Sequence, residues 1–357
     1  MKIALFDIDS KIPNLALMKL SSYYKSRGCQ VKLSKRSELI SADLYFASAV
    51  FSSDKSQAKI RQLNERYGRR LIIGGTGASL EACLADEVDR SFPDYSLYAH
   101  RHYAIGFLTR GCNKRCEFCV VPKKEGRLQS DYASFEDFVP KGQQNVMLLD
   151  NNLLASPTAG ALLAEAVKRR FKINFSQTLD IQHLTDDLYE RLKKVDSVNS
   201  RFTRRMFYFS CNTVKQAEWF SRKADMLRGF GKERVTAVVM YGFNTRLSQD
   251  FAILKMMKKL GIIPFVQEYE PTLGAPARVP EDYFDMDLDE VAAFRMRTNG
   301  RNGEKFLRYV NRRYFERYGR YYLPLLQAIY RYNNKPRLQH FLEHPELLSI
   351  DLYKQYA

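Results

Sequence analysis

Strand-like apolar runs and segments with helical periodicity alternate along the first 98 residues. The strand-like runs are residues 2–6, 31–34, 42–50 and 70–73, and the helix-like segments are 14–27, 57–67 and 80–88. Such alternation is typical of an open parallel sheet with helices on both faces. We therefore predict an α/β domain over residues 1–98. Gly74-Gly75-Thr76-Gly77 follows the fourth run, where a glycine-rich turn allows a ligand or another backbone segment to approach closely.

A second alternating series follows a polar linker and extends to about residue 280. Its strand-like runs are 104–108, 146–150, 173–179, 206–211, 235–241 and 263–268, and its helical segments are 159–170, 186–195, 214–227 and 249–260. Six strand and helix units predict a partial (βα)6 barrel over residues 99–280. In parallel barrels the chemistry lies at the carboxyl ends of the strands, because the loops converge there.

Residues 281–357 form a third region, in which the sign of the charge changes. Residues 281–290 are acidic, whereas 291–340 contain twelve Lys or Arg and two Glu. Arg301, Lys305, Arg308 and Arg312 predict one basic helix face. The apolar stripe opposite consists of Leu307, Val310, Tyr314, Tyr318 and Tyr321. This region is either an amphipathic helical extension that caps the barrel or a surface that grips phosphates.

Charge and composition narrow the class of partner. The chain has 57 basic and 40 acidic residues, a formal charge of +17 that attracts polyanions such as nucleic acid. An ordinary solvated surface is the alternative. No apolar run is long enough for a membrane span and the start does not resemble a signal peptide, so we expect a cytoplasmic protein without membrane contact.

The chemically most specific segment is the loop that follows the first barrel strand. Cys112, Cys116 and Cys119 stand four and three residues apart, and thiolates are the ligands of iron–sulfur clusters. Three ligands leave one iron of a cubane open. A structural zinc usually takes four ligands, and a disulfide set would leave one thiol over. Unrelated buried cysteines are not expected to cluster in a loop this polar.

The pattern Cys-x3-Cys-x-aromatic-Cys, with Phe118 as the aromatic residue, resembles the signature of the radical S-adenosylmethionine (SAM) superfamily. The resemblance implies a [4Fe-4S] cluster on the three cysteines and SAM on the open iron, near Phe118. It also implies reductive cleavage of SAM to a 5′-deoxyadenosyl radical, with electrons from a reductant protein such as flavodoxin or ferredoxin.

Polar residues end the predicted barrel strands, and the resemblance assigns several of them to SAM. Asp150, Asn151 and Asn152 correspond to the segment that binds the SAM amino group, although its two glycines are absent, and Gly242 and Asn244 to the segment that holds adenine. Gln177, Asp180, Gln182 and Ser210 are further candidates. The alternative for each is a helix cap or turn residue that has no role in binding. Cys211 is either a hydrogen donor to a substrate radical or an inert buried residue.

The first domain resembles the flavodoxin- or Rossmann-like cobalamin-binding domain that precedes the barrel in one branch of radical SAM proteins. The resemblance depends on the order of elements and on Gly74-Gly75. The Asp-x-His-x-x-Gly pattern is absent and no His precedes His100, so a vestigial domain without cobalamin is the favoured interpretation. Cys29 and Cys83 are expected to be small core residues.

The segment Gly-Cys-Asn-x2-Cys-x2-Cys-Val-Val-Pro also resembles the cluster loop of tRNA methylthiotransferases. Those enzymes carry three further cysteines in their first domain, where this chain has two. The sequence therefore favours a radical SAM enzyme that functionalises an unreactive C–H bond, with nucleic acid as the preferred substrate. A peptide- or metabolite-modifying radical SAM enzyme and a non-catalytic metal-binding protein that binds nucleic acid are the alternatives.

Overall fold

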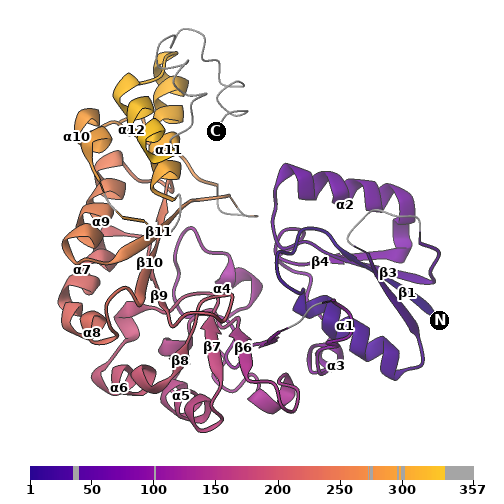
Figure 1. Ribbon diagram of the computed structural model, residues 1–357. Helices are drawn as coiled ribbons and strands as arrows, with labels where there is room; N and C mark the ends of the chain where they lie inside the picture. Colours follow the sequence, from indigo (N-terminus) through magenta and orange to yellow (C-terminus); the bar gives the residue numbers. More distant parts are fainter. Residues whose placement is uncertain are drawn as a thin grey trace. The chain divides into compact units, whose positions relative to one another are not determined.

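The computed structural model describes residues 1–34, 40–99, 102–271, 273, 276–295, 297–298 and 302–333. The chain forms two compact units. The first comprises Met1–Leu179, His183–Arg205 and Pro271–Pro276, and the second comprises Asp180–Gln182, Met206–Glu270 and the described residues from Ala277 onward. Both are mixed α/β structures with parallel sheets (Figure 1).

The first unit begins with a four-stranded parallel sheet of order β2-β1-β3-β4. Apolar residues pack on both of its faces, one cluster with Leu17 and Leu20 of α1 and the other with Leu63 and Tyr67 of α2. The predicted alternation is therefore confirmed. The elements are β1 (Lys2–Asp7), α1 (Leu15–Ser26), β2 (Gln30–Ser34), β3 (Leu44–Ser48), α2 (Asp54–Tyr67), β4 (Leu71–Gly74) and α3 (Asp86–Asp89).

The helix predicted over 80–88 is mostly wrong, since only α3 is helical there. The Ser79 hydroxyl accepts hydrogen bonds from the backbone N–H groups of Glu81 and Ala82. A serine turn of this kind offers the backbone an alternative to the helix.

The first unit contains a second parallel sheet, of order β5-β6-β7-β8. β8 was not predicted, because two residues carry no periodicity. The elements are β5 (Ala104–Gly106), α4 (Val121–Lys124), β6 (Asn145–Leu148), α5 (Ala159–Lys168), β7 (Lys172–Phe175), α6 (Asp186–Lys194) and β8 (Asp196–Ser197).

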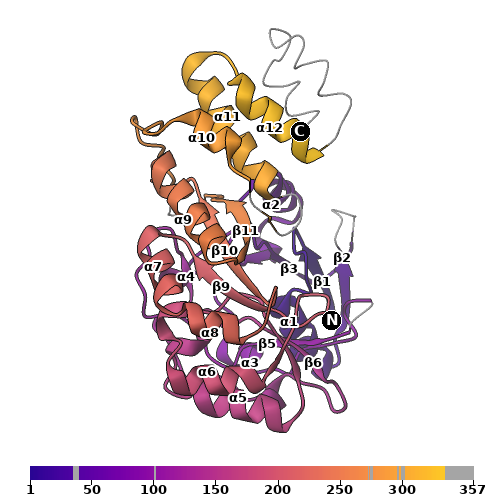
Figure 2. The ribbon, with the colours of Figure 1, turned by 60° about the vertical axis from the view of Figure 1, so that its left-hand side comes forward.

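The second unit is built on the parallel sheet β11-β10-β9. Helices α7, α8 and α9 lie along this sheet (Figure 2). The single helix predicted over 214–227 is divided at Lys223, whose ammonium donates to the carbonyls of Ile181 and Gln182. The elements are β9 (Phe207–Cys211), α7 (Val214–Arg222), α8 (Ala224–Gly229), β10 (Val235–Tyr241), α9 (Leu247–Lys259) and β11 (Ile263–Glu268).

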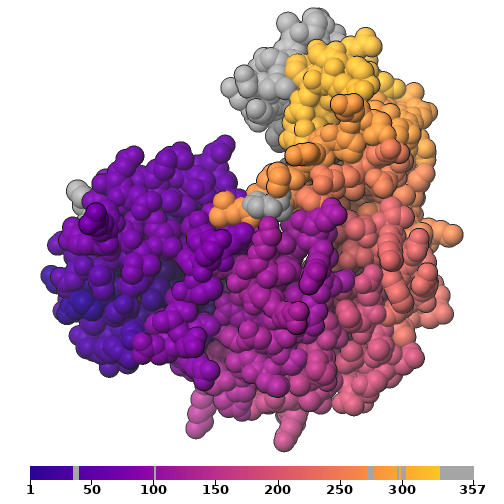
Figure 3. All heavy atoms as spheres, turned by 180° about the vertical axis from the view of Figure 1, so that it is seen from behind, coloured from indigo at the N-terminus to yellow at the C-terminus, as the bar shows by residue number. Residues whose placement is uncertain are grey.

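The C-terminal helices are joined to this sheet through α11. They are α10 (Leu288–Ala293), α11 (Asn302–Tyr318) and α12 (Leu323–Asn333), and α11 contacts both β11 and α12. In Figure 3 the atoms of these helices are orange to yellow and lie against the salmon-coloured atoms of the rest of the second unit. Within the described residues no helix is both long and apolar enough to span a membrane.

The predicted basic face of α11 is largely paired within the chain. Arg308 forms an ion pair with Glu304, and Arg312 with Glu268 at the end of β11. Arg301 lies outside the described residues. Tyr318 in the predicted apolar stripe is 48% exposed, whereas Val310 is fully buried. These contacts favour the interpretation of this region as a packed cap of the sheet.

Candidate active site

The cysteine loop is closed at its neck by its own backbone. Arg110 and Gln129 exchange two backbone hydrogen bonds, of 3.1 and 2.8 Å, and the Cys112 N–H donates to the Gly126 carbonyl. Gly111 has φ of +81°, and a Cβ there would lie 2.4 Å from the Arg127 carbonyl oxygen. Only glycine tolerates both the conformation and the contact. The loop that carries the thiols is therefore a closed structure with fixed ends.

All three thiols lie half-buried in this loop. The Cys119 N–H donates to the Cys116 carbonyl. The backbone N–H of Lys114 donates to the Cys112 sulfur at 3.4 Å. Burial raises the pKa of the Cys119 thiol, and the neighbouring Cys116 and Cys112 raise it further. The sulfurs thus lie near enough to influence one another. In the described part of the chain, no three His, Cys, Asp or Glu side chains already converge as metal ligands.

The polar residues after β6 bind the beginning of this loop. The buried Asp150 carboxylate accepts from the backbone N–H groups of Leu108 and Thr109 and from the Thr109 hydroxyl at 2.8 Å. Burial raises the pKa of Asp150 to about 6, although these donors oppose the shift. The Asn151 side-chain oxygen accepts from the Gly111 N–H at 3.1 Å. Both side chains therefore position the loop; their contact with SAM stays a prediction.

Asn152 differs from its two neighbours. Its side-chain nitrogen lies 3.6 Å from the Cys112 sulfur, and its side-chain oxygen is buried with no hydrogen-bond partner in the described part of the chain. A buried acceptor without a donor costs about 1–3 kcal/mol, so such an atom marks a place where a ligand donor fits. An ammonium group beside the Cys112 sulfur is a donor of the required kind.

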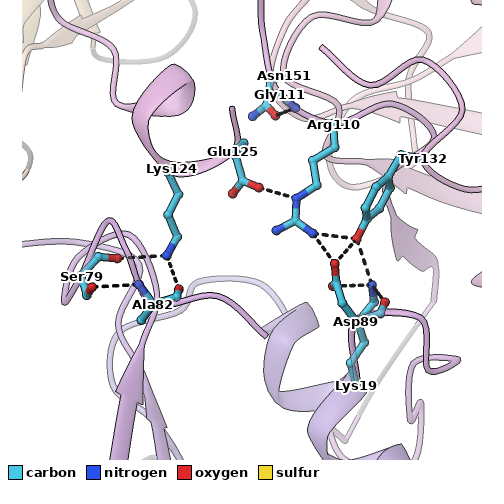
Figure 4. A network of polar contacts seen from close by, with 10 residues as sticks. All are labelled: Lys19, Ser79, Ala82, Asp89, Arg110, Gly111, Lys124, Glu125, Tyr132 and Asn151. Carbon is cyan, nitrogen blue, oxygen red and sulfur yellow. Dashed lines mark hydrogen bonds and ion pairs between the residues drawn. The ribbon is translucent and has the colours of Figure 1, made fainter. Parts of the chain in front are cut away.

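A charged network holds the neck from outside the loop (Figure 4). The Arg110 guanidinium lies 2.7 Å from the Asp89 carboxylate and 2.6 Å from the Tyr132 hydroxyl, and it also pairs with Glu125. Lys19 donates to the same Asp89 carboxylate at 2.9 Å. Burial alone would raise the pKa of Asp89, but the Tyr132 hydrogen bond and the Lys19 charge bring it below its ordinary value. Asp89 is thus an anion shared by two cations.

A second contact joins the first domain to α4. The Lys124 ammonium donates to the Ser79 carbonyl at 3.0 Å and to the Ala82 carbonyl (Figure 4). Sequence reasoning missed Lys19, Asp89 and Lys124, because each lies in an unremarkable local pattern. The position of Arg110, directly before Gly111, was the one available signal.

The predicted site residues divide between the two units. Those in the first unit are Cys112, Cys116, Phe118, Cys119, Asp150, Asn151, Asn152 and Gln177, and those in the second are Asp180, Ser210, Cys211, Gly242 and Asn244. Phe118 is half-buried in the loop and Gln177 is exposed after β7.

In the second unit, Asp180 and Asn244 have the local contacts of turn residues. The Asp180 carboxylate accepts from the Gln182 N–H, and the Asn244 side-chain oxygen accepts from the Arg278 N–H. Gly242 has φ of +82°, and a Cβ there would lie 2.7 Å from the Tyr309 hydroxyl. The backbone is therefore close to α11 at the carboxyl end of β10.

Cys211 is on the helix-facing side of β9. It is fully buried and alternates in register with Phe209, whose ring contacts Phe220 of α7, while Ser210 points to the opposite face. Burial raises the pKa of the Cys211 thiol to about 12. This geometry favours a packing role, and the hydrogen-donor role stays a prediction.

The first domain does not fit a histidine-ligated cobalamin. Residues 1–99 contain no His. The glycine-rich turn after β4 is filled by the chain itself: a Cβ on Gly75 would lie 2.2 Å from the Ala49 carbonyl oxygen, and one on Gly77 would overlap the Phe51 backbone. These glycines therefore serve backbone packing. Cys29 packs in a core cluster and Cys83 is exposed, against the expectation that both are core residues.

Comparison with known proteins gives partial sequence matches, and no family model matches the chain. A tRNA-2-methylthio-N(6)-dimethylallyladenosine synthase of Bacteroides thetaiotaomicron is 25% identical over 241 residues, 57% of this chain and 52% of that protein. A ribosomal protein uS12 methylthiotransferase of Thermus thermophilus is 31% identical over 113 residues, 28% of this chain and 26% of that protein. The chain thus spans about half the length of the first of these relatives and about a quarter of the second.

Two crystal structures of Streptococcus suis SuiB also align with the chain. The complex with S-adenosylmethionine gives a TM-score of 0.35 at 14% identity and covers 73% of this chain and 54% of SuiB. The complex with the precursor peptide SuiA gives a TM-score of 0.36. Because both TM-scores are below 0.5, we base no functional conclusion on them. The chain is weakly similar in sequence to methylthiotransferases that act on tRNA or on a ribosomal protein.

Proposed function

We propose that this protein is a radical SAM iron–sulfur enzyme that functionalises an unreactive C–H bond, with nucleic acid as its substrate. One observation carries the proposal: one closed loop carries the three half-buried thiols of Cys112, Cys116 and Cys119, and beside the first of them lies a buried acceptor on Asn152 that has no hydrogen-bond partner among the described residues. The methylthiotransferase relatives support it.

In this proposal Cys112, Cys116 and Cys119 hold a [4Fe-4S] cluster, and Asn152 accepts from the amino group of SAM. When bound, a cluster with one open iron supplies the electron that cleaves the SAM sulfonium to a 5′-deoxyadenosyl radical. Asp150 and Asn151 fix the backbone before Cys112, so that the first sulfur is held in place before the ligand arrives. Gly242, at the carboxyl end of β10, is the proposed adenine contact.

Nucleic acid is favoured over peptide or metabolite by the formal charge of +17. We do not extend the proposal to methylthiolation. The resemblance associates that reaction with three further cysteines in the first domain, and residues 1–98 contain Cys29 and Cys83 alone.

Anaerobic reconstitution with iron and sulfide tests the proposal. The parent should acquire an absorption band at about 400 nm, which is typical of thiolate-bound iron. With a strong reductant it should also convert SAM to 5′-deoxyadenosine. Cys116→Ala should lose the band and the product, whereas the matched control Cys83→Ala should keep both. A parent that binds iron and makes no 5′-deoxyadenosine would indicate the alternative, a metal-binding protein without catalysis.

A further inference from the structure

A cationic hollow lies at the amino edge of the sheet in the second unit, away from every residue assigned above. It has a volume of about 580 Å³, which is in the range of ligand pockets. Three separate segments bring cations to it: α8 and the turn after it, the end of α9, and the chain after α10. These cations are Arg228, Lys232, Lys258, Arg295 and Arg297.

The acidic residues at this hollow leave most of the positive charge uncompensated. Among the described residues that line it, Glu233 is the one acid, and it forms an ion pair with Arg297. Arg228 pairs with Asp225, a carboxylate whose side chain is 94% exposed. Counting five cations against these two acids leaves a charge of +3 (5 minus 2). The floor between them is apolar and consists of Leu227, Val235, Leu260, Ile262 and Ile263.

We propose that this hollow docks the sugar–phosphate backbone of a nucleic acid, with phosphates on the cationic rim and a base or sugar on the apolar floor. The proposal depends on the nucleic-acid substrate proposed above and adds a surface on which that substrate binds. Charge complementarity selects the partner, since phosphate contacts need cations within reach and little else. Arg308 and Arg312 of the tail already pair with Glu304 and Glu268, whereas Lys232, Lys258 and Arg295 of the hollow form no ion pair among the described residues.

The position of the hollow indicates docking and not catalysis. Val235 and Ile263, the first residues of β10 and β11, line it, whereas Gly242 follows the far end of β10. A strand of seven residues is about 20 Å long. A nucleic acid held here would be anchored roughly that far from the carboxyl edge of the sheet, a span that an extended or folded RNA can cover.

Charge reversal in the full chain tests the proposal. Lys232→Glu with Lys258→Glu removes two exposed rim cations, and Lys55→Glu with Arg61→Glu on α2 is a control with the same change in net charge. The probe is a fluorescein-labelled RNA hairpin, and binding is measured by anisotropy across a salt series. The rim variant should bind at least about tenfold more weakly, with a salt slope shallower by about 1.5, whereas the control should stay within about threefold of the parent.

Three outcomes would overturn the docking site: no RNA binding by the parent, equal losses in both variants, or displacement of RNA by polyglutamate at equal charge concentration. The last would indicate an acidic protein partner. Formation of 5′-deoxyadenosine without RNA, measured on the same proteins, separates the two proposals. If the parent forms no 5′-deoxyadenosine, the radical SAM activity is refuted. The docking site would still stand if the rim variant binds RNA more weakly than the control variant.

Discussion

Replacing Asp89 with Asn should loosen the cysteine loop although residue 89 contacts none of the sulfurs. The Asp89 carboxylate accepts from Lys19, Arg110 and Tyr132, and Arg110 directly precedes Gly111 at the loop neck. Asn has nearly the same shape but no charge, and its amide presents N–H groups to cations that need an acceptor. The substitution therefore removes the shared anion without creating a cavity.

The size of the effect follows from the two hydrogen bonds between Asp89 and a cation, Lys19 or Arg110, that are lost. Each is worth about 1.5–3 kcal/mol when its partners are shielded from water. Lys19 still donates to the backbone carbonyl of residue 89, and Arg110 still pairs with Glu125. Each cation therefore loses only part of its stabilisation. We expect a cost of about 2–3 kcal/mol, which raises the equilibrium for local opening of the neck roughly 30- to 140-fold. Because the folded-state pKa of Asp89 is lowered, its contribution is complete at neutral pH and disappears as the pH falls through that value.

Hydrogen exchange followed by mass spectrometry measures this opening directly. Peptides covering residues 107–132 should exchange faster in Asp89→Asn at neutral pH, and the cluster of the reconstituted protein should pass to an iron chelator faster. Asp94→Asn is the matched control: its carboxylate also binds a lysine, Lys25, and a hydroxyl, but Lys25 is 41% exposed and the contact lies away from the neck. Unchanged protection over 107–132, or an equal effect of the control, would refute a role of Asp89 at the neck.

Three further substitutions test other parts of the structure. Burial raises the pKa of Asp250 to about 7, so the stability of the parent should fall as the pH rises from about 4 to about 7. Asp250→Asn should remove this pH dependence. The measurement is the thermal unfolding midpoint at about pH 5 and about pH 8, followed by Trp219 fluorescence. Asn152→Ala should weaken SAM binding to the reconstituted protein about 10-fold or more by calorimetry, and Asn145→Ala should not. Cys211→Ala should lower the Trp219 midpoint, at a cost of about 1 kcal/mol, because the side chain is fully buried; an unchanged midpoint would contradict the packing role.

Periodicity predicted the strands well because apolar runs are local properties of the chain. All six runs expected between residues 99 and 280 are strands, as are the four before them. The errors lie at identifiable residues: Ser79 accepts two backbone hydrogen bonds where a helix was expected, and the backbone of Lys223, with φ of −107° and ψ of 20°, is not helical between α7 and α8.

The three cysteines were assigned to a cluster from their spacing alone, and that assignment stays a prediction. The residues that hold their loop were not predictable, since Asp89 and Arg110 are 21 positions apart and Lys19 and Asp89 are 70 apart. The same limit applies to charge. The sequence shows four cations on one helix face, but the carboxylate of Glu268 that pairs with Arg312 comes from a different element. Composition thus indicates the class of partner, and only the fold indicates which cations are available to it.

The contacts at the loop neck predict that residues 1–98 support the cysteine loop, a role that needs no cofactor. Three thiolates repel one another, and ordering a flexible loop around a metal costs conformational entropy before any sulfur is bound. Here Asp150 holds the backbone that enters the loop, and Asp89 and Lys19 of the first domain hold Arg110, which itself pairs with Glu125 where the loop ends. Both ends of the loop are therefore fixed without metal. It follows that substitutions in the first domain should change cluster retention without contacting a ligand.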